Sequence, residues 1–342
     1  MPLDRNDPGR NSIGDLTYLG GVQLLSEAGG FGGYSGLRFL PDGRLLAISD
    51  RGHWLAFRTE ERKGRLVGVG DATLGPLLDE AGQPLAYPDF DAEALEVVGI
   101  PAGGLEILVA FEQRHRIWRY AVPDTAPVRV GARQPAPAVT QIQKAFARKA
   151  DALPWLEDWS GSLPANAGLE AMAVAPDGAA LLLAEGTGEG RFRPRHDAPW
   201  VPIRYAAEPG FKPTDAVFLP GEGRHLAIVV NRYFSILHGV AARLELVDLD
   251  TVLDGKAQDG RAQDGRAQDG KAQAGLLQGR LLARLAPPVS VDNMEALALA
   301  PHPDGGWSLY LLADDNQNPL QRTLLLKFHL PEFHLPARVI AR

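Results

Sequence analysis

Polar residues that could bind a cation frame five hairpin-like phrases along this chain of 342 residues. In each phrase a polar residue opens an apolar run, a turn rich in proline and glycine follows, and a second apolar run closes on another polar residue. The opening residues are Ser35, Glu93, Glu170, Asp215 and Glu295, and the closing residues are Asp50, Glu112, Glu185, Asn231 and Asp314. Two strands of similar length joined by a tight turn bring their far ends together. We therefore expect both polar residues of a phrase at one edge of a hairpin.

Carboxylates gathered in this way point to a metal ion. Like charges a few ångström apart repel each other or force protonation, and a cation removes both costs. Oxygen ligands without sulfur favour calcium over zinc, and magnesium takes fewer protein ligands. We predict that calcium, or another divalent cation, is held by Glu93, Glu170, Asp215 and Glu295. The alternative is that each polar strand end is merely solvated or caps a turn.

The closing positions and the arginines after them suggest roles in an ester-cleaving reaction. A carboxylate of Glu112, Glu185 or Asp314 that is not a metal ligand could accept a proton. Four arginines follow the closing positions and could bind an anionic substrate, because the planar guanidinium matches phosphate and carboxylate oxygens: Arg51, Arg114, Arg232 and Arg322. Equally, these arginines could pair with the adjacent acids and only hold them in place.

The repetition of the phrase predicts the fold. Repeated hairpins around an axis would collect their polar ends at one central mouth, which is the pattern of an all-β protein with the β-propeller fold. The spacing favours six blades, with the two ends of the chain forming the sixth together; five blades is the second choice. A short helix is expected near 140–156, where apolar residues recur at helical spacing.

We divide the chain into a polar, flexible lead-in at 1–15 and a single propeller domain at 16–342. A first strand is expected at 16–25, and a strand at 337–340 could pair with it to close the ring. The segment 254–275 repeats a five-residue unit of the Lys/Arg-Ala-Gln-Asp-Gly type. It lacks the apolar residues needed to form a core, so we expect an exposed loop inserted in the domain.

Composition limits the partners. A net charge of −7 argues against nucleic acid, and no apolar stretch approaches the roughly 20 residues that cross a bilayer. The chain has no cysteine, which excludes disulfides and thiolate metal sites. We expect a monomer that binds a small anionic ester. We expect it neither to bind nucleic acid nor to insert into a membrane.

Several segments resemble a known family. They read SGLRFLPDGRLLAISDRG, GLEAMAVAPDG, GFKPTDAVFLP and DNMEALALAP, followed by LLADDNQNPLQRTLLLKF. The chain is similar over most of its length to the phytase-like family described as having "esterase-like activity of phytase". The resemblance implies a β-propeller, commonly exported in bacteria and distantly similar to calcium-dependent propeller phytases and lactonases. Asn231 departs from the family pattern, in which an acid is common there.

Three functions are compatible with these patterns. The first is a calcium-dependent hydrolase of phosphoesters or related anionic esters. The second is a non-catalytic propeller, stabilised by calcium, that binds a ligand or a partner protein. The third is a lactonase or carboxylesterase using the same metal site. The resemblance implies a periplasmic or secreted protein whose leader is absent from this sequence, and a cytoplasmic location is the alternative.

Overall fold

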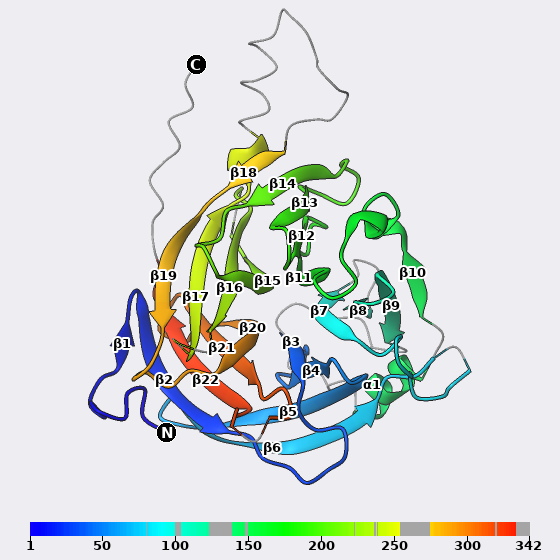
Figure 1. Cartoon of the computed structure of the whole chain (residues 1–342). Helices are drawn as coiled ribbons and strands as arrows, with labels where there is room; N and C mark the ends of the chain where they lie inside the picture. The colour runs from blue at the N-terminus through cyan, green and yellow to red at the C-terminus, as the bar shows by residue number, and fades with distance from the viewer. Residues whose placement is uncertain are drawn as a thin grey trace, which may run out of the picture.

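In the computed structural model, short antiparallel sheets stand side by side around a central axis (Figure 1). The structure describes residues 1–79, 81–99, 104–122, 139–147, 150–221, 223–235, 237, 239–253, 274–318 and 320–332. The innermost strands are β3 (Tyr34–Phe39), β7 (Ala92–Gly99), β11 (Leu169–Val174), β15 (Lys212–Leu219) and β20 (Asn293–Pro301). Each contacts the next around the axis, and β20 contacts β3. The ring is therefore closed, and the fold is a β-propeller.

Each innermost strand begins a blade. Blade 1 continues with β4 (Leu45–Ser49), β5 (His53–Arg62) and β6 (Arg65–Pro76). Blade 2 continues with β8 (Leu105–Phe111), β9 (Arg116–Val122) and β10 (Asp151–Leu153). Blade 3 continues with β12 (Ala180–Ala184), β13 (Glu189–Arg193), β14 (Val201–Tyr205) and a parallel β18 (Gly275–Leu277). Blade 4 continues with β16 (Leu226–Ser235), β17 (Gly239–Asp248) and β19 (Gly279–Leu285). Blade 5 continues with β21 (Trp307–Asp314), β22 (Leu324–Leu330) and β2 (Leu16–Gln23).

The described strands give five blades, so the favoured count of six is not confirmed. The expected first strand exists as β2, but it pairs with β22 as the outer strand of blade 5. The N-terminal part of the chain thus completes a blade that the C-terminal part begins, which leaves no separate sixth sheet among the described residues. Pairing the two parts covers an edge that would otherwise be exposed. The expected strand at 337–340 lies outside the described residues.

Residues 1–15, expected to form a flexible lead-in, pack on the propeller. Leu3 is fully buried, and its carbonyl accepts a hydrogen bond from Ser290 N at 2.6 Å. The terminal amine of Met1 donates to Gly21 O at 2.7 Å. A short strand, β1 (Ser12–Ile13), pairs with β2. The segment therefore contributes to the outer wall of blades 4 and 5.

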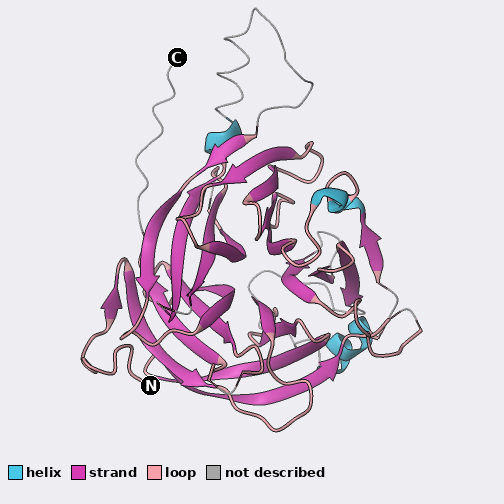
Figure 2. Ribbon diagram, in the orientation of Figure 1, coloured by secondary structure: helices cyan, strands magenta, loops and turns pink. Residues whose placement is uncertain are grey.

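The helix expected at 140–156 is present but shorter. It is α1 (Val139–Phe146), which lies outside the ring of strands with the short 3₁₀ helices η1 (Pro154–Leu156) and η2 (Ser160–Ser162) (Figure 2). Phe146 stacks on Trp54 with 5.8 Å between ring centroids. Beyond the helix, β10 pairs with β9 to complete blade 2. The helical spacing of the apolar residues predicted a helix to residue 156, but residues 151–153 pair with β9 as a strand instead.

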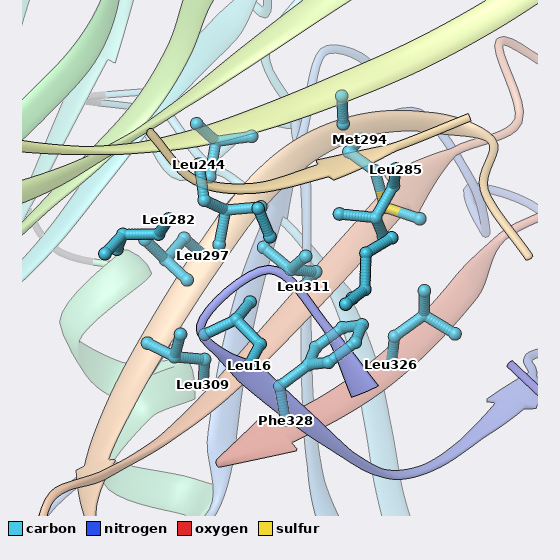
Figure 3. Close-up of a cluster of buried hydrophobic side chains, with 14 of the residues drawn as sticks. Leu16, Leu244, Leu282, Leu285, Met294, Leu297, Leu309, Leu311, Leu326 and Phe328 are labelled. Atoms are coloured by element: carbon cyan, nitrogen blue, oxygen red, sulfur yellow. The ribbon is translucent and has the colours of Figure 1, made fainter. Parts of the chain in front are cut away.

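The apolar core lies between neighbouring blades. In its largest cluster, leucines of blade 4 such as Leu244 and Leu282 meet Leu297, Leu311 and Phe328 of blade 5 (Figure 3). All five side chains are at most 1 % exposed, and full burial of such a side chain stabilises by about 1.5–3 kcal/mol. Each blade is thus fixed by both neighbours, which fixes the strand ends at the axis.

Two further observations bear on the domain. Positions 254–273 of the expected loop lie outside the described residues, and Gly275 begins β18. In the part of the chain that the structure describes, no helix is long and apolar enough to span a membrane.

Candidate metal centre and adjoining basic pocket

Every innermost strand carries a β-bulge near its start. The register with the second strand of the blade shifts at one residue in each case, namely Ser35, Glu93, Glu170, Thr214 and Glu295. A bulge inserts an unpaired residue and redirects its side chain. The structure thus places Glu93, Glu170 and Glu295 at equivalent positions around the axis. In blade 4 this position belongs to Thr214 and not to Asp215.

The residues that close the phrases also occupy equivalent positions in the blades, except in blade 4, where the equivalent residue is one position later than expected. The amides of Asp50, Glu112 and Glu185 bond to carbonyls just before the bulges, at 2.8, 2.8 and 3.0 Å. Asp314 pairs with Asn293 in the same register. In blade 4 the residue in this register is Arg232, which pairs with Lys212.

Asn231 lies one position earlier and is fully buried. Its Nδ2 donates to the hydroxyl of Tyr205 at 2.8 Å, while Oδ1 has no hydrogen-bond partner among the described residues. The fourth blade therefore presents Thr214 and Arg232 at positions where blades 2, 3 and 5 present acids, and Lys212 where blade 2 presents Asp91. We call the end of the ring that carries the bulges the mouth.

The acids at the mouth form one electrostatic cluster. Burial raises the pKa of Glu93 well above its usual range, and the charges of Glu170, Asp91 and Glu112 raise it further. Burial likewise raises the pKa of Glu170 well above its usual range, with added repulsion from Glu185, Glu295 and Glu112.

Other acids around the ring shift in the same direction. Burial is the largest cause of the raised pKa of Glu112 (about 7), Glu295 (about 8), Asp50 (about 7) and Asp314 (about 6). A cation would relieve this repulsion.

Blade 2 brings three carboxylates close enough to share one ion. A ligand oxygen from each of Asp91, Glu93 and Glu112 lies within 4.8 Å of the others. No described Lys or Arg side chain forms an ion pair with any of these three residues. All the atoms that could coordinate a metal ion here are carboxylate oxygens. Such a set suits a hard divalent cation such as calcium or magnesium. The residues present therefore fit a metal ion, and this acidic cluster could bind one.

Blade 4 supplies the positive charge on the other side of the mouth. Arg232 bonds to Glu185 Oε1 at 2.5 Å and lies 3.0 Å from Glu295 Oε1. Lys212 Nζ donates to Glu185 Oε2 at 2.9 Å. Both oxygens of Glu185 are therefore held by cations. The mouth is polarised, with uncompensated acids on blade 2 and cations on blade 4.

Asp215, expected to be a metal ligand, lies inside the ring and binds Arg38. Its two oxygens accept hydrogen bonds from the Arg38 guanidinium at 2.9 Å each, and Oδ2 also accepts from Leu297 N at 2.7 Å. Burial alone would lower the pKa of Arg38, but the charges of Asp215 and Glu96 outweigh it and the pKa is raised. Because both of its oxygens are hydrogen-bonded to Arg38, Asp215 is not available as a metal ligand.

Arg38 contacts all five innermost strands. From β3 it donates to Glu96 of β7 at 3.1 Å and to Asp215 of β15. It also donates to the carbonyls of Met172 in β11 and Leu297 in β20, both at 2.8 Å. The side chain is 4 % exposed, so it fills the axis just below the bulges.

A basic pocket of about 860 Å³ adjoins the mouth at blades 4 and 5. It is lined by three arginines, Arg5, Arg232 and Arg322, and by amide side chains that include Asn293 and Gln321. Arg322 also donates to Asp292 Oδ2 at 3.1 Å. No ion pair of Arg5 with a described residue is present. The pocket therefore offers several guanidinium donors in one place.

The other two predicted arginines do not line this pocket. Arg51 is 47 % exposed at its side chain and lies 3.7 Å from Asp50. Arg114 is 66 % exposed and pairs with Asp89 at 3.0 Å. For these two, pairing with a nearby acid is the arrangement seen.

The three candidate proton acceptors differ in their partners. Glu112 belongs to the blade 2 triad and accepts a hydrogen bond from Gly168 N. Glu185 is paired with two cations. Asp314 is 5 % exposed, and its Oδ1 has no hydrogen-bond partner among the described residues. Among these three acids, Asp314 is the one with a buried oxygen that lacks a hydrogen-bond partner among the described residues.

Sequence reasoning missed Thr214, Arg38 and Arg5. No local pattern separates Thr214 from Asp215, because the position of the bulge depends on how β15 pairs with β16. For Arg38 a signal existed, since a charged residue in the middle of an apolar run must find a buried partner. Arg5 lies far from the phrases in the sequence and reaches the pocket only because residues 1–15 pack on the propeller.

The fold and this site define a β-propeller with an acidic, polarised mouth. The chain belongs to the phytase-like family, described as "esterase-like activity of phytase", whose model matches residues 29–317. No curated protein matches the chain.

Solved structures resemble it at low identity. A protein of unknown function from Bacteroides caccae is 10 % identical, with 86 % of this chain and 77 % of that chain covered and a TM-score of 0.37. A streptogramin B lyase is 9 % identical, with coverages of 92 % and 97 % and a TM-score of 0.37. The PQQ-bound aldose sugar dehydrogenase of Streptomyces coelicolor is 12 % identical, with coverages of 90 % and 97 % and a TM-score of 0.38.

Proposed function

We propose that the protein is a calcium-dependent hydrolase of phosphoesters or related anionic esters and acts at the mouth of the propeller. The observation that carries the proposal is the polarity of the mouth. An uncompensated acidic triad lies on blade 2, and a pocket lined by three arginines lies at blades 4 and 5. A metal-binding side and an anion-binding side are what cleavage of an anionic ester requires.

The residues that would hold the cation are Asp91, Glu93 and Glu112. A divalent cation bound there would polarise an ester oxygen and stabilise the negative charge that develops on it. Glu170 lies next to this group, since its charge raises the pKa of Glu93. Its neighbours on the other side are Glu185 and Glu295, so it connects the acidic and the basic halves.

Arg322 and Arg232 would bind the anionic group of the substrate, with Arg5 at the edge of the same pocket. A guanidinium can donate two parallel hydrogen bonds to a phosphate or carboxylate. Arg232 is already paired with Glu185 and Glu295, so it mainly supplies a fixed positive charge. Arg322 keeps part of its donor set free beside Asp292, which makes it the main contact.

Asp314 would accept the proton of the attacking water. Its Oδ1 has no hydrogen-bond partner among the described residues, and burial raises its pKa to about 6. Such a carboxylate is mostly ionised at neutral pH and still basic enough to take a proton.

Activity on a panel of phosphoesters, carboxyl esters and lactones tests the proposal. The purified protein should cleave anionic esters with calcium present and lose this activity in excess chelator. Arg322→Ala should raise KM with little change in kcat, because a contact made equally in substrate and transition state is uniform binding. Arg51→Ala is the matched control and should leave KM unchanged.

Other outcomes decide among the remaining functions. Cleavage of neutral esters or lactones that Arg322→Ala does not affect would favour the lactonase or carboxylesterase function. Calcium binding without turnover on any member of the panel would favour a non-catalytic binding propeller.

A further inference from the structure

A second pocket lies at the other end of blades 2 and 3, away from the mouth. It has a volume of about 460 Å³ and is lined in part by the turn residues Pro176, Asp177 and Gly178. This turn joins β11 to β12, whose far ends carry Glu170 and Glu185 at the mouth. The pocket therefore shares no lining residue with the basic pocket or the acidic cluster.

A buried arginine without a counter-ion faces this second pocket. Arg193 lines it, is 8 % exposed, and lies in β13 opposite Ala180. Its guanidinium carbon is 4.7 Å from the ring centroid of Trp155 and 4.8 Å from that of Trp200. Its Nε has no hydrogen-bond partner, and no described carboxylate pairs with it. The two indoles hold the side chain, but neither neutralises its charge.

The other ionisable side chains that line the second pocket are Glu106, Arg119, Asp177 and His196, and none of them pairs with Arg193. Arg119 pairs with Asp151 at 2.9 Å and with Glu106 at 3.6 Å. Asp177 accepts a hydrogen bond from Ala179 N at 3.0 Å. The remaining walls are largely apolar and include Val98, Leu108 and Leu153. The second pocket thus combines one uncompensated, oriented cation with apolar surface.

We propose that the second pocket binds a small organic carboxylate with a flat apolar body. Burying a charge without a partner is costly, and a ligand carboxylate would supply the missing partner. The guanidinium can donate two parallel hydrogen bonds to a carboxylate, while Trp155 and the aliphatic walls would contact the apolar body. The volume falls within the range of small-molecule sites.

Calorimetric titration with 2-naphthoate tests this assignment. The wild-type protein should bind 2-naphthoate, and it should bind neutral 2-naphthol and inorganic phosphate at least tenfold more weakly. Arg193→Gln should weaken 2-naphthoate binding at least tenfold, which corresponds to about 1.4 kcal/mol. The matched control is Arg191→Gln on the same strand, because Arg191 lies over Trp159 and does not line the second pocket. Binding to this control should equal that of wild type.

Two further variants keep the proposal testable. Val98→Trp should fill the second pocket and abolish binding while Arg193 stays in place. This variant tests the pocket even if Arg193→Gln does not fold. Arg322→Ala should bind 2-naphthoate as wild type does, so failure of the mouth as an ester site leaves this result intact. Equal binding of 2-naphthoate and 2-naphthol, unchanged binding by Arg193→Gln, or no binding by wild type would overturn the assignment.

Discussion

Single residues at the mouth differ in role because their partners differ. Glu185 and Asp314 occupy equivalent positions in blades 3 and 5, yet Glu185 is paired with Lys212 and Arg232 while Asp314 keeps one oxygen free. Sequence position alone gave both the same rank as candidate bases. The difference arises from the cations of blade 4, which the linear pattern does not reveal.

Asp314→Asn tests the role of the free oxygen. If Asp314 is the proton acceptor, kcat on an anionic ester should fall about 100-fold or more, because general bases contribute on the order of 10²–10⁴. Calcium affinity should change little, since Asp314 lies outside the blade 2 triad. Steady-state kinetics with saturating calcium measures the loss. Asp315→Asn, which alters the adjacent turn, should keep most of the activity; similar losses in both variants would count against the assignment.

The raised pKa values of the mouth acids predict how stability depends on pH without metal. Between the unfolded pKa near 4.5 and the folded values of about 7 for Glu112 and about 8 for Glu295, the folded state binds more protons than the unfolded state. This contribution is fully present at pH 4 and is lost as pH rises through 8.

Urea unfolding in chelator at pH 5 and pH 8 measures this dependence. Glu295→Gln should reduce the loss of stability between the two values, and calcium should stabilise the wild type more at pH 8 than at pH 5. An identical pH dependence in wild type and Glu295→Gln would contradict the proposed repulsion.

At the scale of elements, the sequence predicted the hairpins and their common edge because turn residues and apolar runs are local signals. It failed by one residue in blade 4, where Asp215 was taken for the ring position held by Thr214. Asp215 is drawn inward by Arg38, a residue 177 positions away in the chain. Which residue of a strand occupies the bulge depends on how that strand pairs with its neighbour, and this has no local signature in the sequence. The helix was overestimated for a related reason, since β10 forms only by pairing with β9.

Arg38→Met should destabilise the protein strongly. The change leaves the buried carboxylates of Asp215 and Glu96 without their cation, and breaking a buried pair from one side costs about 3–5 kcal/mol. Arg58→Met is the control, because Arg58 is 45 % exposed and its buried partner Asp42 keeps a second cation, Arg44, at 2.6 Å. It should cost less than about 1 kcal/mol in the free energy of unfolding. Equal costs in a urea titration would show that the axis does not depend on Arg38.

At the scale of the whole molecule, closure of the ring brings together residues from distant parts of the chain. Blade 5 combines β2 from the N-terminal part with β20 to β22, and the same packing carries Arg5 to the basic pocket. The propeller fold followed from the repeated phrase. The number of blades did not, because outer strands have no phrase of their own and the two ends of the chain share one blade.

Calcium titration of metal-free protein, followed by calorimetry and thermal unfolding, tests the central claim most directly. The wild type should bind calcium and unfold at a higher temperature, since a hundredfold excess over Kd stabilises by about 2.7 kcal/mol. Glu93→Gln and Glu112→Gln should each weaken binding, whereas Glu189→Gln, an exposed acid of β13, should not. The account would be contradicted if the metal-free wild type showed neither binding heat nor a shift in thermal midpoint, or if all three variants bound calcium as the wild type does.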